Sequence, residues 1–87
     1  EFSAYNFEYS NTENLFKIFD MVESESLFLI EKKLALPAYD QCLKASHIFN
    51  LLDARGVIGV AQRAGYISRI RELAKAVGST WLENSNK

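Results

Sequence analysis

Residues 37–56 read PAYDQCLKASHIFNLLDARG and predict a helix with both of its ends marked. Pro37 suits the first position, because proline lacks the amide hydrogen that would have no helical partner there. Gly56 suits the position after the helix, where a left-handed backbone commonly ends it. Between them a mostly apolar row is expected to face a core: Tyr39, Cys42, Leu43, Ser46, Phe49 and Leu52. The predicted helix covers residues 37–54.

A helix is also expected before this segment. Ser10 followed by Glu13 forms a capping-box pattern, in which each side chain bonds the other residue's amide. The pattern predicts a first helix over residues 11–33, and its expected inward row is Leu15, Ile18, Phe19, Val22, Phe28 and Leu29. Ser24 and Ser26 thin that row, which marks either a partner contact or a poorly packed turn.

A third helix is predicted over residues 60–82, with an expected apolar row of Val60, Ala64, Ile67, Ile70, Ala74, Val77 and Trp81. Gly65 and Gly78 fall inside this helix. Glycine weakens a helix interior by ~1 kcal/mol relative to alanine, so we expect close packing against a neighbour to explain them. Three amphipathic helices joined by short loops predict an all-α fold, an up-down-up three-helix bundle.

The first nine residues differ from the rest of the chain. Phe2, Tyr5, Phe7 and Tyr9 alternate with polar positions, which is typical of a half-buried strand or an extended arm. A lone strand has nothing in this chain to pair with, so we expect the arm to belong to a structure that precedes it. The predicted organisation is an extended amino-terminal arm over residues 1–9 and one helical bundle domain over residues 10–87.

The composition is that of one small folded domain. The chain has 87 residues, of which 48% are hydrophobic and 13% aromatic, too many for a disordered segment. The longest apolar run, residues 27–30, is far too short to cross a bilayer, and no signal peptide opens the chain, so no membrane partner is expected. The single cysteine, Cys42, cannot close an intrachain disulfide, which favours a cytoplasmic location.

Charge is divided unevenly along the chain. The net charge is −1, but residues 1–36 hold seven acidic and three basic side chains, a net of −4. Residues 37–87 hold four acidic and seven basic side chains, a net of +3. Either the two parts attract each other, or the basic part faces an anionic partner.

Several longer stretches resemble one family. The runs Leu36-Pro-Ala-Tyr39, Leu43-Lys-Ala-Ser-His47 and Phe49-Asn-Leu-Leu-Asp-Ala-Arg55 are similar to the carboxyl-terminal part of the bacterial glycyl-tRNA synthetase alpha subunit. Residues 1–9 are similar to the segment that leads out of that family's catalytic domain, and residues 66–77 are similar to its terminal helix. The resemblance therefore covers essentially the whole chain.

This resemblance implies a function for a larger protein and a place for the chain within it. The parent enzyme would activate glycine with ATP and Mg²⁺ and transfer it to tRNA(Gly), in a cytoplasmic assembly of two alpha and two beta subunits. The chain would be a carboxyl-terminal helical domain with a structural or docking role, and its partners would be its own catalytic domain and the beta subunit. The alternative is a stand-alone helical interaction module without enzymatic activity.

No catalytic, cofactor-binding or metal-binding residue is predicted in this chain, which is expected to be inactive alone. Class II synthetases position ATP with an arginine two residues before a glutamate and with a Gly-x-Gly-x-x-Arg pattern, and neither occurs here. Gly56 and Gly59 match the Gly-x-x-Gly loop of KH domains weakly, because the residues between them are apolar. We interpret His47 as a hydrogen-bonded helix residue rather than a general base, and Cys42 as an inert buried thiol.

Asp53 is the first candidate site residue. It lies in the last turn of its predicted helix, against the negative end of the helix dipole, so a compensating group is expected. The candidates are Arg55, Arg63 and the amides of residues 60–62. With one of these partners Asp53 would form a structural latch at the corner between the second and third helices.

A series of basic residues in the third helix forms the second candidate site: Arg63, Arg69, Arg71 and Lys75. One interpretation is a phosphate-facing stripe, with Arg69, Arg71 and Lys75 as the contact for tRNA or another partner. The other is a solvated surface that forms ion pairs with the acidic first helix. The basic positions fall on more than one helix face, which favours the second interpretation.

Overall fold

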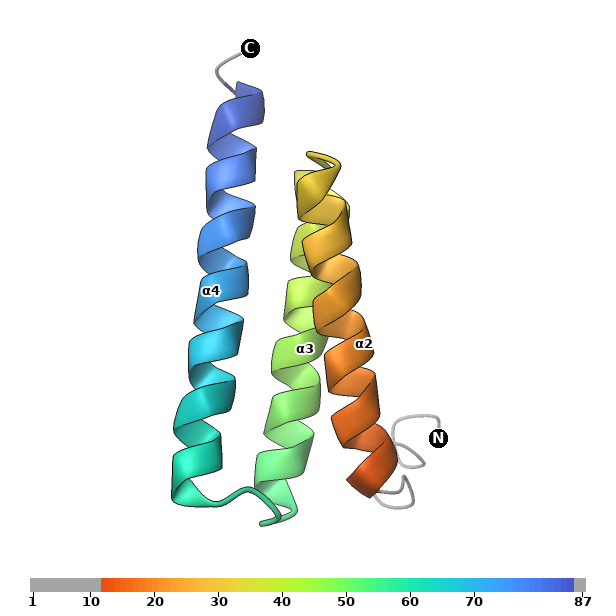
Figure 1. Cartoon of the computed structure of the whole chain (residues 1–87), viewed down its shortest axis with the longest axis vertical. Coiled ribbons are helices and arrows are strands. Elements are labelled where there is room, and N and C mark those ends of the chain that lie inside the picture. Colours follow the sequence, from red (N-terminus) through yellow and green to blue (C-terminus); the bar gives the residue numbers. More distant parts are fainter. Residues whose placement is uncertain (1–11, 86–87) are drawn as a thin grey trace.

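The computed structural model describes residues 12–85, which form three helices: α2 (Thr12–Glu31), α3 (Ala35–Ala54) and α4 (Val60–Ser85). Figure 1 shows α3 between the other two, with neighbouring helices running in opposite directions. This part of the chain contains no strand. The prediction of an all-α, up-down-up bundle is therefore confirmed, whereas the predicted arm over residues 1–9 and the Ser10 cap lie outside the described residues.

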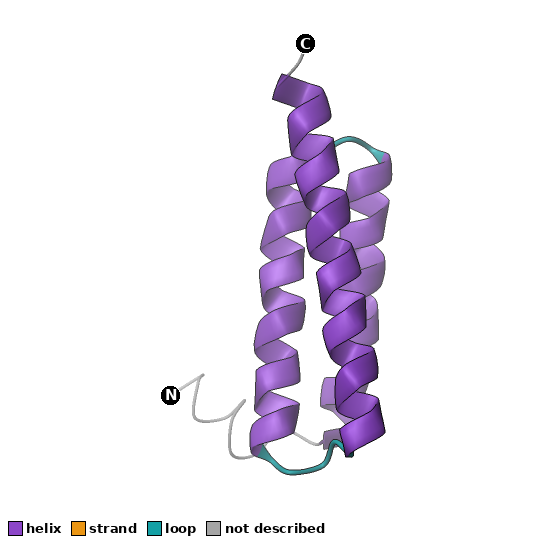
Figure 2. Ribbon diagram, turned by 90° about the vertical axis from the view of Figure 1, so that its left-hand side faces the viewer, coloured by secondary structure: helices purple, strands orange, loops and turns teal. Residues whose placement is uncertain are grey.

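Helix α4 is the longest of the three, with 26 residues against 20 in each of the others. The carboxyl-terminal end of α4 passes beyond the turn that joins α2 to α3 (Figures 1 and 2). Helix α4 runs three residues further than the predicted end at residue 82, and α3 begins two residues before Pro37. Pro37 still lies in the first turn of α3, where a missing amide hydrogen costs nothing.

The corner between α3 and α4 follows the sequence pattern closely. Gly56 has a φ of 69°, and its amide donates to the carbonyl of Asp53 at 3.0 Å. The next helix is capped at Gly59, whose amide donates to the side-chain oxygen of Gln62 at 3.1 Å. Ile58 is buried and closes this end of the bundle. The expectation that a left-handed Gly56 ends the second helix is confirmed.

The turn between α2 and α3 has a left-handed residue that the sequence does not mark with glycine. Lys33 has a φ of 65°. Its amide donates to the carbonyl of Ile30, and the amide of Leu34 donates to that of Leu29, each at 2.9 Å. This pair of bonds is the Schellman ending of a helix, which is usually built on glycine. Lys33 therefore occupies a strained backbone position that the surrounding contacts must maintain.

The core is centred on α3, which buries side chains toward both neighbours. Phe19 of α2 and Leu52 of α3 are completely buried, and the small residues Ala38 and Ala45 allow α2 to approach α3 closely. The main apolar cluster consists of Leu15, Phe19, Cys42, Ala45, Ile48, Phe49, Leu51, Leu52, Ile58 and Leu73. Because α3 is the central helix, a single apolar row could not describe it. Tyr39 and Leu43 of the predicted row are exposed, and Ile48 and Leu51 are buried instead.

The predicted inward rows of the outer helices are partly wrong. In α2, Ile18 and Phe28 are exposed. In α4 the buried residues are Leu73, Val77 and Thr80, whereas Val60 and Trp81 are exposed. Tyr66 and Ile70 continue the observed α4 row, so the helix is rotated by about one residue from the predicted face. The sequence pattern failed here because alanines and glycines leave the apolar side of α4 weakly defined.

Three small residues also differ from expectation. Ser26 is completely buried and its hydroxyl donates to the carbonyl of Ala38 at 2.9 Å, so it is a close-packing point between α2 and α3. Ser26 is therefore neither a partner contact nor part of a poorly packed turn. Gly65 and Gly78 are exposed, and a Cβ built on either would meet no atom within 4 Å. The prediction that close packing explains these glycines is wrong.

Candidate functional site

Asp53 and Arg63 meet at the corner between α3 and α4. The Nε and Nη2 atoms of Arg63 donate to Oδ1 of Asp53 at 3.1 and 2.7 Å. The side chains are 43% exposed for Arg63 and 37% exposed for Asp53. The guanidinium therefore offsets the carboxylate that the α3 dipole disfavours, and it does so from the first turn of the next helix.

Arg55, the other arginine of the proposed latch, occupies a different position. It is the C-cap residue of α3, and its amide donates to the carbonyls of Leu51 and Leu52, each at 3.2 Å. Its backbone thus takes part in ending the helix. Sequence reasoning grouped Arg55 and Arg63 because both are close to Asp53 along the chain, and it did not foresee that the Arg55 amide takes part in ending α3.

Arg69 joins α4 to α2. Its Nε donates to Oε2 of Glu23 at 3.0 Å, and its Nη2 donates to Oδ1 of Asp20 at 2.8 Å and to Oε1 of Glu23. The hydrogen bond with Glu23, followed by that with Asp20, raises the pKa of Arg69 even though partial burial lowers it. The guanidinium carbon also lies 4.7 Å from the ring centre of Phe19 and 5.0 Å from that of Tyr66.

These contacts engage both the charge and the flat surface of the Arg69 guanidinium. Two carboxylates accept hydrogen bonds from the N–H groups at the edge of the guanidinium. Two aromatic rings lie within cation–π distance of its carbon atom. The rings of Phe19 and Tyr66 contact each other edge to face, with 4.8 Å between centres. The acidic α2 is thus attached to the basic α4, which is one of the two arrangements that the charge distribution left open.

The other two basic residues of the series, Arg71 and Lys75, do not share the surroundings of Arg63 and Arg69. Lys75 is exposed and lies 3.8 Å from Glu72 on its own helix. Arg71 is exposed. Because Arg63 contacts α3 and Arg69 contacts α2, the four basic residues do not form one continuous surface.

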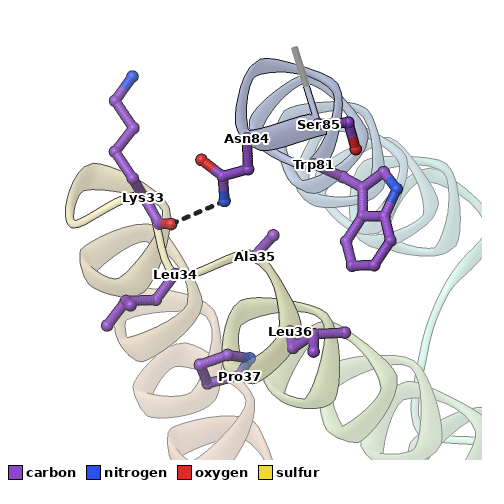
Figure 3. A pocket seen from close by; sticks show the side chains of 8 residues that line it. All are labelled: Lys33, Leu34, Ala35, Leu36, Pro37, Trp81, Asn84 and Ser85. Atoms are coloured by element: carbon purple, nitrogen blue, oxygen red, sulfur yellow. Dashed lines mark hydrogen bonds between the residues drawn. The ribbon is translucent and has the colours of Figure 1, made fainter. Parts of the chain in front are cut away.

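A third polar contact, which sequence reasoning missed, joins the end of α4 to the turn between α2 and α3 (Figure 3). The Nδ2 atom of Asn84 donates to the carbonyl of Lys33 at 3.1 Å, and Nζ of Lys33 lies 2.7 Å from Oε1 of Glu83. Beside these groups is a shallow pocket lined by Lys33, Leu34, Ala35, Leu36, Pro37, Trp81, Asn84 and Ser85. The prediction stopped the third helix at residue 82, which excluded Glu83 and Asn84.

An apolar groove lies between α2 and α3. Its cavity measures about 540 Å³. Its apolar lining consists of Leu15, Ile18, Val22, Leu43, Ile48 and Leu51, and its polar lining of Asp40, Lys44 and His47. His47 is exposed at this groove. Sequence reasoning missed the groove, because it placed Ile18 and Leu43 in the inward rows of their helices, whereas the bundle leaves both exposed.

The comparison with known families is decisive for the assignment of this chain. A sequence model of the family described as the glycyl-tRNA synthetase alpha subunit matches residues 1–86. The chain belongs to this family. The resemblance stated from the quoted sequence runs is thereby confirmed. Membership in the glycyl-tRNA synthetase alpha subunit family implies part of a ligase, in a subunit that assembles with other subunits.

Within this glycyl-tRNA synthetase alpha subunit segment, the described residues include few groups suited to chemistry. Across residues 12–85 no cluster of three His, Cys, Asp or Glu side chains could hold a metal ion. Cys42 is buried, and desolvation raises the pKa of its thiol, which keeps it protonated at neutral pH. None of the described helices is long and apolar enough to cross a membrane. The contacts of Arg63, Arg69 and Asn84 hold helices together, and the two hollows described above are lined mainly by apolar side chains.

Proposed function

We propose that the chain is the carboxyl-terminal helical domain of a glycyl-tRNA synthetase alpha subunit and that its own role is structural or docking. The parent would be a class II, cytoplasmic enzyme that binds ATP and Mg²⁺ outside this segment and ligates glycine to tRNA(Gly). The observation that supports the structural role is the engagement of Arg69 by Glu23 and Asp20. An arginine held by two carboxylates and two rings is poorly placed to bind a phosphate.

The proposed partners follow from the family and from the open apolar surfaces. They are the catalytic domain of the same subunit and the beta subunit in an assembly of two alpha and two beta chains, while tRNA(Gly) is bound by the parent enzyme. Leu36, Trp81 and Leu82 are at least half exposed around the end of α4. Exposed apolar groups of this size are more typical of a docking surface than of a contact with tRNA phosphates.

Deletion of the bundle from the full alpha subunit tests the structural role. Removal of residues 10–87 should leave a catalytic domain that aggregates or loses activity through instability. Glycine-dependent pyrophosphate exchange measures the activity, and light scattering measures the aggregation. In the same assay the 87-residue chain alone should give no exchange above a heat-killed control. A truncated subunit that stays monodisperse and fully active would refute the structural role.

The second candidate function is a stand-alone helical interaction module, and the exposure of Trp81 and Leu36 supports it equally, because an exposed apolar surface does not by itself identify its partner. The two functions differ in what the surface binds. Titration of the 87-residue chain against purified beta subunit and against tRNA, each at two salt concentrations, separates them. Saturable binding to the beta subunit with a weak salt dependence supports the docking domain, whereas absence of binding to either component favours the independent module.

A further inference from the structure

The apolar groove between α2 and α3 is incompletely filled by the described residues. Leu15, Ile48 and Leu51 are buried at its base, while Ile18 and Leu43 remain 39% and 49% exposed along its sides. Uncovered apolar side chains at the boundary of two packed helices gain free energy when another apolar group covers them. The groove thus offers a binding surface for a short segment with several large apolar side chains.

The segment of this chain that precedes α2 has the matching chemistry. Tyr5, Phe7 and Tyr9 are two residues apart, so in an extended backbone their rings lie on one side. Phe2 has the opposite parity and would lie on the other side. One face of an extended segment over residues 5–9 would therefore present three aromatic rings in a row.

The dimensions of the groove and the segment agree. Asp40 and Leu51 mark the two ends of the α3 wall, roughly 16 Å apart at 1.5 Å per helical residue. Tyr5 and Tyr9 are about 13 Å apart at 3.3 Å per extended residue. Three rings on such a segment would therefore span most of the groove without reaching past its ends.

The connection to α2 is also short enough. Leu15, at one end of the groove, lies three residues after Thr12, where α2 begins. Ser10 and Asn11, which separate Tyr9 from Thr12, are residue types that favour tight turns. A turn at these two residues would send the preceding segment back along α2, antiparallel to it and over the groove.

From this agreement we propose that the groove between α2 and α3 binds the aromatic segment Tyr5–Tyr9 of the same chain. The rings of Tyr5, Phe7 and Tyr9 cover the apolar lining. The polar lining, Asp40, Lys44 and His47, gives the two tyrosine hydroxyls hydrogen-bonding partners at the solvent edge.

Docking of this segment also determines how the bundle is oriented within a larger subunit. With Tyr9 at the Leu51 end of the groove, Tyr5 lies at the Asp40 end and the chain before it leads toward the turn between α2 and α3. A catalytic domain attached there would sit beside that turn. This orientation rests on the proposed function, whereas the docking itself does not.

Nuclear Overhauser contacts in the 87-residue chain test the docking directly. Ring protons of Phe7 should show contacts to the methyl groups of Ile18 and Leu43, and none to those of Val77 on α4. A sample that mixes differently labelled chains distinguishes contacts within one chain from contacts between two. Absence of the contacts, or contacts that occur between chains alone, would overturn the proposal.

A double-mutant cycle provides a second, energetic test. Phe7→Ala and Leu43→Lys should each lower the folding equilibrium constant, and together they should show a coupling of about tenfold, measured by urea unfolding. Leu27→Lys is the matched control, because Leu27 is 51% exposed and lies outside the groove. It should show no coupling to Phe7→Ala, and Phe2→Ala should show none to Leu43→Lys.

Equal coupling in the groove and control pairs, or additive effects of Phe7→Ala and Leu43→Lys, would refute docking in this groove. Both tests use the 87-residue chain, without other subunits, substrates or tRNA. Their outcome is therefore separate from that of the proposed function, which depends on the activity and assembly of the full enzyme.

Discussion

The side-chain amide of Asn84 donates a hydrogen bond to the main-chain carbonyl of Lys33, with 3.1 Å between nitrogen and oxygen. This bond joins residues 51 positions apart and attaches the last turn of α4 to a strained turn between α2 and α3. Lys33 adds an ion pair with Glu83, but both side chains are 56% exposed. The backbone strain and the side-chain contacts at Lys33 therefore oppose each other, and substitutions can separate them.

Lys33→Gly should leave the free energy of unfolding nearly unchanged. Glycine relieves a left-handed backbone cost of ~1–2 kcal/mol, whereas its greater freedom in the unfolded chain costs ~0.5–1 kcal/mol and the loss of an exposed ion pair costs ~0.2–1 kcal/mol. Lys33→Ala loses the same ion pair and keeps the strain, so it should be less stable than Lys33→Gly by about 1 kcal/mol. Urea unfolding of the two variants measures this difference. Equal stabilities would show that the φ of 65° costs no more than the added flexibility of glycine.

Alanine substitutions at three glycines should have opposite effects. Gly65→Ala and Gly78→Ala should each stabilise the chain by ~0.5–1 kcal/mol, because alanine favours a helix and nothing obstructs its Cβ at either position. Gly56→Ala should destabilise it by ~1 kcal/mol, because Gly56 has a φ of 69°. Thermal unfolding midpoints compare the three variants. A lower midpoint for Gly65→Ala or Gly78→Ala would indicate a contact beyond the described bundle.

Asp53→Ala should destabilise the bundle by about 1 kcal/mol, because it removes the partner of Arg63 while relieving an unfavourable dipole interaction. The partial exposure of both side chains keeps this loss of stability small. Comparison with Arg63→Ala and with the double variant isolates the pair, and the coupling should weaken as salt is raised. An unchanged or raised melting midpoint for Asp53→Ala would reject the latch.

Arg69→Lys should destabilise the bundle by ~1–2 kcal/mol, because an ammonium cannot donate in a fork to Glu23 or lie flat over Phe19 and Tyr66. Arg71→Lys, at an exposed position of the same helix, is the control and should change stability little. Urea unfolding provides the comparison. Equal effects of the two substitutions would mean that the forked donors and flat face of the Arg69 guanidinium contribute nothing beyond its charge.

The same two arginines allow a separate test against tRNA. On the structural interpretation, replacing Arg69 and Arg71 by alanine in the full enzyme leaves tRNA affinity and its salt dependence nearly unchanged. If both arginines contacted phosphates, the magnitude of the log–log salt slope would fall by about two. Titrations at several salt concentrations measure the slope.

The thiol of Cys42 should react slowly with a disulfide reagent in the native state, because burial raises its pKa and blocks access. The unfolded chain ionises its thiol at a lower pH than the folded chain. The contribution of Cys42 to stability is therefore complete below the ordinary thiol pKa and declines as pH rises above it. Comparison of wild type and Cys42→Ala by urea unfolding across alkaline pH isolates this effect. A native thiol that reacts as fast as the unfolded one would contradict its burial.

The helices were predictable because their signals are local. Pro37 and Gly56 marked the ends of α3 to within two residues, and α2 begins at Thr12, one residue after the predicted start. The left-handed backbone at Lys33 was not predictable, because no glycine marks it and its partner Asn84 lies 51 residues away. Ser26 was missed for a related reason. Its hydroxyl bonds a carbonyl on another helix, and no pattern within α2 reveals that partner.

The candidate sites were predictable to different degrees. Asp53 and Arg63 are close in sequence and share one corner, so electrostatics alone suggested their contact. The partners of Arg69 lie 46 and 49 residues away, and charge imbalance indicated which helix they belong to but not which acids they are. The groove between α2 and α3 required the structure, because it depends on which side of each helix the bundle leaves open.

The contact between α2 and α4 has a mechanical consequence. Arg69 of α4 binds Glu23 and Asp20 of α2, while α3 packs against both of these helices. Each helix is therefore held by the other two. A force applied to one helix is shared between two contacts, so the bundle should turn as one rigid body when a neighbouring domain moves.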